Sequence, residues 1–273
     1  MKTGVVLTYD TNINENFKWC VKNDIPSCQL SVSPELETKE TAIVIQEAQN
    51  RHNMEITALV GTWSGVNEWN FLHGPATLGI VPPAYRALRM KELEKCARFA
   101  QMLHVTDVCT HVGFIPENPS EPLYAEVVAA IRYLARYYKD FGVRFNLETG
   151  QETPVTLLRI IHDVGADNVG LNFDPANLLM YGKANPVDAL AVVGKYVNGV
   201  HAKDGEYPTD GMNLGQEKAL GKGSVRIELL VEKLIEIGYD GALTIEREIS
   251  GEQQKMDVIA ANKLLLEIIQ KRS

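Results

Sequence analysis

Four residues that can bind a metal ion each follow a short apolar run in the second half of the chain. They are Glu148 in RFNLETG, Asp174 in GLNFDPAN, His201 in NGVHAKD and Glu246 in ALTIERE. Each run is bounded by glycine, proline or a charged residue, which is typical of a buried parallel strand. We therefore expect four strand ends that converge on one point and together form a metal site.

The donor set indicates which kind of ion this site would take. One imidazole nitrogen and several carboxylate oxygens suit Mn²⁺, Mg²⁺ or Co²⁺ better than zinc, which favours thiolates. We predict a divalent ion, with Mn²⁺ first among these. A strand-end carboxylate can also simply cap the next helix. Four such residues on consecutive strands favour the metal site over four separate caps.

Strands and helices alternate along the whole chain and must position these side chains. We predict strands at 4–8, 26–31, 54–60, 106–111, 143–148, 168–173, 197–202 and 241–246. We predict helices at 14–22, 34–52, 82–103, 121–140, 153–165, 185–195, 224–238 and 253–271. The helical periodicity turns Phe17, Cys20 and Val21 to one face of the first helix, and Ala42, Ile45 and Ala48 inward from the second.

Eight strand-then-helix units without a linker predict one α/β domain over residues 1–273, a single (β/α)8 TIM barrel. An open doubly wound sheet usually has fewer strands. The loops that follow the strands at 61–81, 112–121 and 203–224 are long, whereas the turns between helix and strand are short. In a barrel the loops after the strands carry the active face, so the long loops lie where chemistry is expected.

Composition limits the class of partner. The formal net charge of −8 and the pI near 5.3 disfavour extended contact with nucleic acid. The opening MKTGVVLTYD contains an apolar stretch too short for a signal sequence or a membrane span, so we expect a cytoplasmic protein with no membrane partner. The four cysteines, at 20, 28, 96 and 109, lack CxxC or zinc-knuckle spacing, and we expect reduced, mostly buried thiols.

The loop at 61–81 carries aromatic side chains between glycines. Trp63 follows its strand closely, and we predict that it contacts the substrate, because an aromatic plane can cover a sugar ring. We expect Trp69 and Phe71 to pack onto the barrel rim. Helix 82–103 is a candidate surface for pairing with a second copy of the chain.

ETG, FDPAN, HAKD and ALGKGSVRIELLVEKLIEIGYDGALTIERE resemble the corresponding segments of the xylose isomerase-like barrel superfamily. The similarity covers essentially the whole chain and is strongest from about Gly142 to Glu248. This superfamily includes ketose 3-epimerases, sugar isomerases, inositol-pathway isomerases and dehydratases, and abasic-site endonucleases. The resemblance implies that the four ligand-type residues form the epimerase metal tetrad, in which the two glutamates also exchange the substrate proton. In the LGKG turn, we expect Gly221 and Gly223 to be needed for positive φ before the helix.

The chain departs from the epimerase pattern beside the tetrad. Asn177 stands where those enzymes tend to place a histidine that touches the sugar. Glu152 is close to the position of a further glutamate, but its spacing differs, so no role is transferred to it. Lys203, Asp204 and Glu206 occupy the region in which the family often has an arginine. The identity of the sugar therefore does not follow from the resemblance.

The residues support proton transfer next to a carbonyl group. A divalent ion can stabilise the enolate, while Glu148 and Glu246 remove and return a proton on opposite faces of the substrate. Return to the same carbon gives epimerisation, return to the adjacent carbon gives isomerisation, and departure of a leaving group gives β-elimination by a lyase or dehydratase. His111 and Lys203 could steady the oxyanion; otherwise, His111 is a rim histidine bound to a backbone group, and Lys203 is a solvated loop residue.

We therefore predict a sugar isomerase or epimerase whose catalytic residues are Glu148 and Glu246. The predicted substrate-binding residues are Trp63, His111, Asn177 and Lys203. We expect a small carbohydrate as substrate and no nucleic-acid partner. An abasic-site endonuclease would need further histidines for a three-metal cluster, and the 203–224 loop contains none. A non-catalytic sugar-binding barrel would not need both glutamates.

Overall fold

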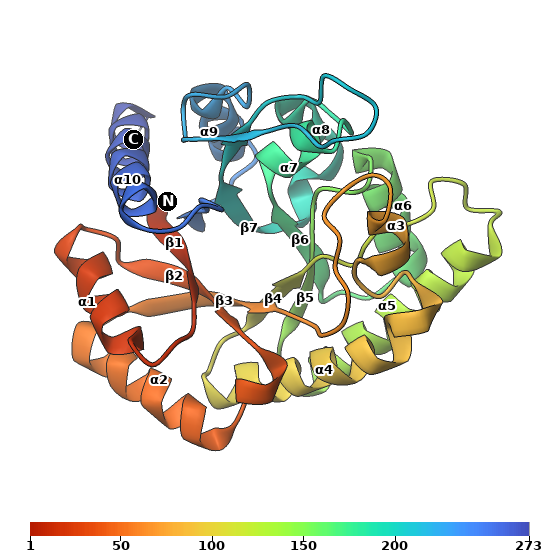
Figure 1. Cartoon of the computed structure of the whole chain (residues 1–273), viewed down its shortest axis with the longest axis horizontal. Helices are drawn as coiled ribbons and strands as arrows, with labels where there is room; N and C mark the ends of the chain where they lie inside the picture. The colour runs from red at the N-terminus through yellow and green to blue at the C-terminus, as the bar shows by residue number, and fades with distance from the viewer. Residues whose placement is uncertain (273) are drawn as a thin grey trace.

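The computed structural model describes residues 1–272, and within them eight parallel strands close into a barrel (Figure 1). Their order around the barrel is β1-β10-β7-β6-β5-β4-β3-β2, with every neighbouring pair parallel. The strands are β1 (Lys2–Thr8), β2 (Ser27–Val32), β3 (Glu55–Gly61), β4 (Asp107–Thr110), β5 (Arg144–Glu148), β6 (Val169–Phe173), β7 (Val197–Ala202) and β10 (Ala242–Ile245). This closed barrel confirms the predicted fold class.

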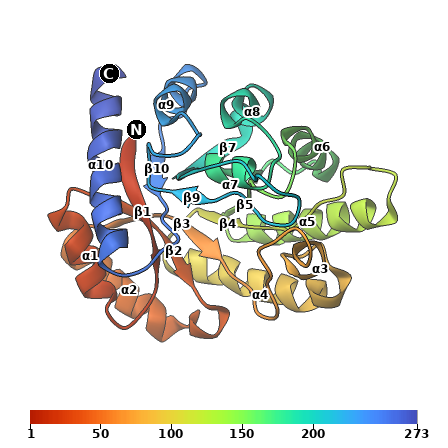
Figure 2. The same cartoon turned by 45° about the horizontal axis from the view of Figure 1, so that its top comes forward.

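Helices surround the strands on the outside, and α10 lies beside β1, where the two ends of the chain meet (Figure 2). The main helices are α1 (Ile13–Lys22), α2 (Lys39–His52), α4 (Pro83–Met102), α5 (Pro122–Asp140), α6 (Pro154–Val164), α8 (Pro186–Val193), α9 (Ile227–Glu236) and α10 (Glu252–Arg272). Several begin with proline in the first turn, where a missing N–H costs no helical hydrogen bond. No helix in the described part of the chain is long and apolar enough to span a membrane.

Short elements that the sequence pattern did not predict lie in the loops after the strands. They are the helices α3 (Gly74–Thr77) and α7 (Pro175–Met180) and the antiparallel pair β8 (Asp204–Gly205) and β9 (Glu217–Lys218). The predicted second helix is divided into the 3₁₀ turn η1 (Pro34–Leu36) and α2, and a second 3₁₀ turn, η2 (Gly194–Tyr196), follows α8. These elements have few residues, so periodicity carries little signal for them.

The predicted inward faces are largely correct. Phe17 and Cys20 are fully buried, as are Ala42, Ile45 and Ala48 on α2. Val21 was assigned to the buried face of α1 and is 43% exposed, so this prediction was wrong. Cys20, Cys28, Cys96 and Cys109 are free and buried, which confirms the expectation for the thiols.

The barrel interior contains a layer of polar side chains below the carboxyl ends of the strands. A small cavity of about 30 Å³ lies there, and Gln29, Asn146 and Asn172 are among its lining residues. Gln29 Nε2 donates to Asn172 Oδ1 over 2.9 Å, and Asn146 Nδ2 donates to Asp107 Oδ1 over 2.9 Å. Barrel interiors are usually filled by branched apolar residues, and burying an amide costs free energy. Packing alone therefore does not explain why these amides lie inside the barrel.

A buried carboxyl group, Glu37, lies between η1 and α2 with 5% of its surface exposed. Burial raises the pKa of Glu37 to about 8, although a hydrogen bond from Cys96 and the charge of Lys95 act in the opposite direction. The folded protein therefore holds this proton more tightly than the unfolded chain does. Its contribution to stability is fully present below the ordinary pKa of 4.5 and is lost as the pH rises through about 8.

We predict that Glu37→Gln removes this loss. Between pH 4.5 and about 8, the free energy of unfolding of Glu37→Gln should rise relative to that of the parent protein by about 1.4 kcal/mol for each pH unit. Urea unfolding at pH 5 and pH 8 measures the difference. The exposed neighbour Glu35 provides the control variant Glu35→Gln, which should run parallel to the parent. Parallel pH profiles for Glu37→Gln and the parent would contradict the prediction.

Candidate metal centre

The four predicted ligands meet at the carboxyl ends of neighbouring strands. Glu148 ends β5, Asp174 and Glu246 directly follow β6 and β10, and His201 lies in β7. One ligand atom from each residue falls within a group in which all atoms lie within 4.8 Å of one another. Three of the residues are at most 3% exposed, and the side chain of Glu246 is 19% exposed. The tertiary structure thus brings together the set that the sequence pattern singled out.

The imidazole of His201 points into the middle of this group. Its Nδ1 lies 3.1 Å from Glu148 Oε1, 3.4 Å from Asp174 Oδ2 and 3.3 Å from Glu246 Oε2. Neither this Nδ1 nor Asp174 Oδ2 makes a hydrogen bond, although both are buried. Buried polar atoms are rarely left without a partner. A ring nitrogen and three carboxylates that face one point could hold a divalent cation.

Asp174 has two structural roles, one on each carboxylate oxygen. Oδ1 accepts a hydrogen bond from the backbone N–H of Asn177 over 2.8 Å and so caps α7. Oδ2 faces the ligand group. Thr149 Oγ1 bonds both the backbone N–H and the carbonyl of Asp174, at 2.8 Å each, and fixes the strand end. Asp174 can therefore cap α7 with one carboxylate oxygen and still face the ligand group with the other.

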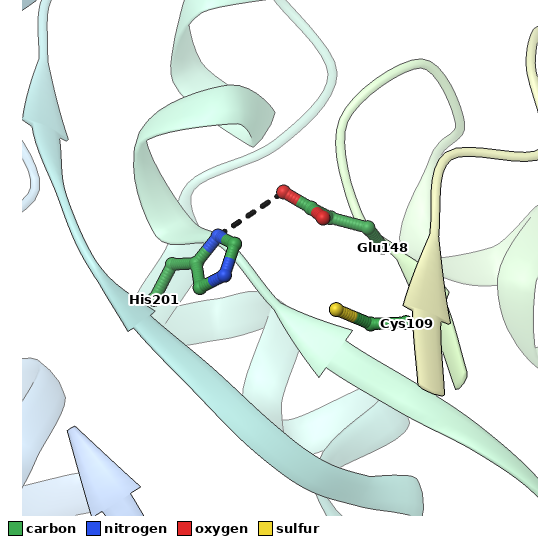
Figure 3. Close-up of side chains that lie close together, drawn as sticks. All are labelled: Cys109, Glu148 and His201. Atoms are coloured by element: carbon green, nitrogen blue, oxygen red, sulfur yellow. Dashed lines mark ion pairs between the residues drawn. The ribbon is translucent and has the colours of Figure 1, made fainter. Parts of the chain in front are cut away.

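A cysteine that the sequence analysis did not assign to the site lies beside it. Cys109 on β4 points toward Glu148 and His201, as Figure 3 shows, and these three residues form a second close group of ligand types. The Cys109 thiol donates to Gln29 Oε1 over 3.4 Å. Burial and the nearby carboxylates, Glu148 first, raise the pKa of this thiol.

Lys203 lies inside the site. It is 1% exposed, so the alternative of a solvated loop lysine was wrong. Its Nζ lies 2.9 Å from Glu246 Oε2 and 2.6 Å from Glu248 Oε1, and it donates to Asn177 Oδ1 over 3.2 Å. Burial opposes the charge of this lysine, but Glu246 and the other carboxylates raise its pKa well above the usual range. A fixed positive charge therefore lies at one edge of the ligand group.

His111 lies just beyond β4 and closes the opposite edge. Its Nε2 is 3.2 Å from Glu148 Oε1, and its Nδ1 is 3.3 Å from Gln151 Oε1. Both contacts are to side chains, so the alternative of a rim histidine bound to a backbone group does not hold. Burial alone would raise the pKa of Glu148, but the charges of His111 and His201 outweigh burial and lower it to about 2. Glu148 is therefore held ionised, as a ligand or proton acceptor must be.

An aromatic wall stands beside His111. Trp63 and Trp69 stack with ring centroids 6.3 Å apart, and the centroid of Trp69 is 5.0 Å from that of His111. The three residues line a cavity of about 120 Å³. Trp69 is 45% exposed, so it leans over the site and is not part of a buried rim core, whereas the ring of Phe71 packs edge-on against Tyr181, with centroids 6.2 Å apart. The predicted contact between Trp63 and substrate stays a prediction.

Arg89 of α4 holds the 61–81 loop in place. The guanidinium is fully buried and donates to the carbonyls of Ser64, Val66, Thr77 and Gly79 at 2.6–3.1 Å. It also lies 4.1 Å from the Trp63 ring centroid and 4.3 Å from that of Tyr85. This one side chain therefore ties four points of the loop to the back of the aromatic wall.

We predict that Arg89→Leu lowers the free energy of unfolding by at least about 2 kcal/mol, because four partly or fully buried hydrogen bonds to loop carbonyls are lost. Protease cleavage within 61–81 should also become faster than in the parent. Urea unfolding and limited proteolysis with mass spectrometry measure the two effects. The exposed Arg98, which also contacts a tyrosine ring, provides the control Arg98→Leu. A stable, equally protected Arg89→Leu variant would show that the loop is held by other contacts.

The LGKG turn wraps the carboxylate of Asp204. The backbone N–H groups of Gly221 and Gly223 each donate to Oδ2 over 2.9 Å, and that of Val225 donates to Oδ1 over 3.0 Å. Gly221 has φ +80°, as predicted. Gly223 does not have a positive φ, so this part of the prediction was wrong. A Cβ at position 223 would lie 2.3 Å from Asp204 Oδ1, so glycine is needed there to leave room for the carboxylate. Asp204, the residue after Lys203, thus anchors the loop that carries this lysine.

Two further buried polar residues beside the site had no predicted role. Gln151 Oε1 contacts His111, and Glu152 is fully buried with neither carboxylate oxygen hydrogen-bonded. Burial raises the pKa of Glu152 to about 8, although the charge of His111 opposes this shift. Polar residues in the loop after a buried strand were the only sequence signal for this pair.

Comparison with known proteins gives the same fold. A xylose isomerase domain protein from Planctomyces limnophilus is 35% identical, with 98% of this chain and 97% of that chain covered and a TM-score of 0.93. A D-tagatose 3-epimerase-like protein is 21% identical over 99% of this chain and 97% of that chain, with a TM-score of 0.74, a likeness that shows the fold alone. An uncharacterized protein of Methanocaldococcus jannaschii is 29% identical over 52% of this chain and 50% of its own length, so the match spans about half of that relative.

The family model described as xylose isomerase-like TIM barrel matches residues 26–267. This range runs from the start of β2 into α10 and contains all four residues of the candidate metal centre. It confirms the resemblance that the ETG, FDPAN and HAKD segments indicated. The chain belongs to the xylose isomerase-like TIM barrel family.

Proposed function

We propose that the protein is a divalent-metal-dependent isomerase or epimerase that acts on a sugar or keto-sugar by proton transfer next to a carbonyl group. The observation that carries this proposal is the pair Glu148 and Glu246. They come from β5 and β10, three strands apart around the barrel, and both lie within 3.3 Å of His201 Nδ1. Two carboxylates that border one point from different strands are suited to exchange a proton on two faces of a substrate.

The electrostatics of the site support this assignment. The pKa of Glu246 is lowered well below its usual range because Lys203 and His201 outweigh the effect of burial. Both glutamates are thus ionised, which is the form that binds a cation and that a general base must have before it takes a proton. A cation held by the four ligands, Mn²⁺ in our proposal and otherwise Mg²⁺ or Co²⁺, would supply Lewis-acid stabilisation of the negative charge that develops on the carbonyl oxygen.

The remaining predicted residues have supporting roles in this proposal. Lys203 and His111 flank the ligand group from opposite edges and can donate hydrogen bonds to substrate oxygens. Asn177 orients Lys203 through its side-chain oxygen and is available to the sugar. Trp63 would present its ring to the apolar face of the sugar, as aromatic walls do in carbohydrate sites. A small carbohydrate is therefore the proposed substrate class.

Solvent exchange tests the proposal directly. The protein, loaded with Mn²⁺, is incubated in deuterated water with a panel of ketoses, inosose-like ketones and 3-keto-glycosides. The products are analysed by NMR after the metal has been removed, and a protein sample treated with a chelator is the control. Deuterium at a carbon next to the carbonyl, only in the metal-loaded sample, supports the proposal. Loss of water from the substrate would indicate a lyase, and no exchange on any member would oppose the assignment.

A further inference from the structure

Gln29, on β2, is a buried amide that contacts the metal centre from below. It is 2% exposed and lies within the barrel, on the far side of His201 from the carboxylates. Its Oε1 is 2.8 Å from His201 Nε2 and accepts the Cys109 thiol over 3.4 Å, while its Nε2 donates to Asn172 Oδ1. The side chain therefore contacts His201, Cys109 and Asn172 at the same time.

The partners of Gln29 select one orientation of its amide. Cys109 Sγ lies 3.4 Å from the amide as a donor, so the atom that faces it should be the oxygen. The same oxygen faces His201 Nε2, which must then carry the hydrogen. An imidazole that binds a cation is neutral and has one N–H and one lone pair, so a hydrogen on Nε2 leaves the lone pair on Nδ1. That lone pair is directed at Glu148, Asp174 and Glu246, which is the position a metal ligand requires.

We propose that Gln29 is a positioning residue of the metal centre, which fixes His201 in the Nε2–H tautomer so that Nδ1 binds the cation. This inference rests on the metal centre of the proposed function and adds to it the nitrogen that serves as ligand and the group that selects it. Metal-bound histidines usually donate their second ring N–H to a carboxylate or carbonyl partner. Here a side-chain amide from β2, three strands away from β7 around the barrel, has that role. It also accounts for a long polar side chain buried in β2.

Two substitutions at position 29 separate the acceptor role from packing. Gln29→Leu removes the acceptor and should weaken Mn²⁺ binding about 10- to 100-fold. Gln29→Glu keeps an acceptor, and Asn172 Nδ2, which has no partner, can turn toward it, so binding should stay within a few-fold of the parent. The matched control Thr244→Val removes a buried, unpartnered hydroxyl that lines the same interior cavity and should leave affinity unchanged. Isothermal titration with Mn²⁺ gives the affinities, and thermal unfolding without metal shows that each variant folds.

The tautomer itself is read by NMR on protein labelled with ¹⁵N-histidine and loaded with diamagnetic Mg²⁺, with His201 assigned by its absence in His201→Ala. The expected result is a hydrogen on Nε2 of His201 and none on Nδ1. This measurement uses no variant of Gln29, so it decides the question even if Gln29→Leu does not fold. A hydrogen on Nδ1, or a parent-like affinity for Gln29→Leu, would overturn the inference. If the parent binds no divalent ion, the proposed function fails as well, and this outcome differs from binding that is insensitive to position 29.

Discussion

Replacing His201 with alanine is expected to remove tightly bound divalent metal and to abolish turnover while the barrel stays folded. The imidazole supplies the one nitrogen of the ligand group, and its loss leaves three carboxylates that repel one another without a replacement donor. Asp174→Ala should have the same effect on metal and activity. Because it also removes the cap of α7, it should cost about 1 kcal/mol of stability in addition.

Metal content by elemental analysis, activity and the circular dichroism spectrum together measure these effects. Asp174→Asn separates the two roles of that residue, because its side-chain oxygen can still cap α7 while the charge on the ligand oxygen is lost. His162→Ala is the control histidine, because this residue is exposed and its Nε2 pairs with the hydroxyl of Tyr196. Full metal content in both His201→Ala and Asp174→Ala would place the metal site elsewhere.

The second large effect is expected from replacing the two glutamates with glutamine. Glu148→Gln and Glu246→Gln keep the shape and one oxygen donor of each side chain, so some metal binding should remain. Neither amide can accept and return a proton, so turnover should fall by at least about 10² to 10⁴. Rate measurements at saturating Mn²⁺ separate this loss from weaker metal binding.

Hydrogen exchange in deuterated water then distinguishes the roles of the two residues. If each glutamate serves one face of the substrate, each single variant should still exchange hydrogen on the face served by the other. Exchange lost in only one variant would indicate a single base, as in an isomerase or lyase, with the other glutamate acting as a ligand only. Full activity in either variant would exclude a two-base mechanism.

The sequence by itself determined the barrel and the four ligand-type residues. Strand and helix alternate without interruption, and short connections force parallel strands to lie side by side in chain order. Glu148, Asp174, His201 and Glu246 stand at the ends of consecutive strands, so closure of the barrel alone brings their backbones together. The local pattern was sufficient to predict the barrel because every strand-then-helix unit has the same geometry.

Only the tertiary structure decided what surrounds these four residues. Lys203 stands in a polar loop whose sequence is typical of solvent exposure, and its burial among carboxylates depends on how that loop folds back onto Asp204. Gln29 contacts His201 through the barrel interior, from a position 172 residues earlier in the chain. Contacts of this kind leave no periodic signal, because they are set by the closure of the barrel and by side-chain direction within it. The sequence therefore identified the candidate ligands, and the fold identified the groups that surround them.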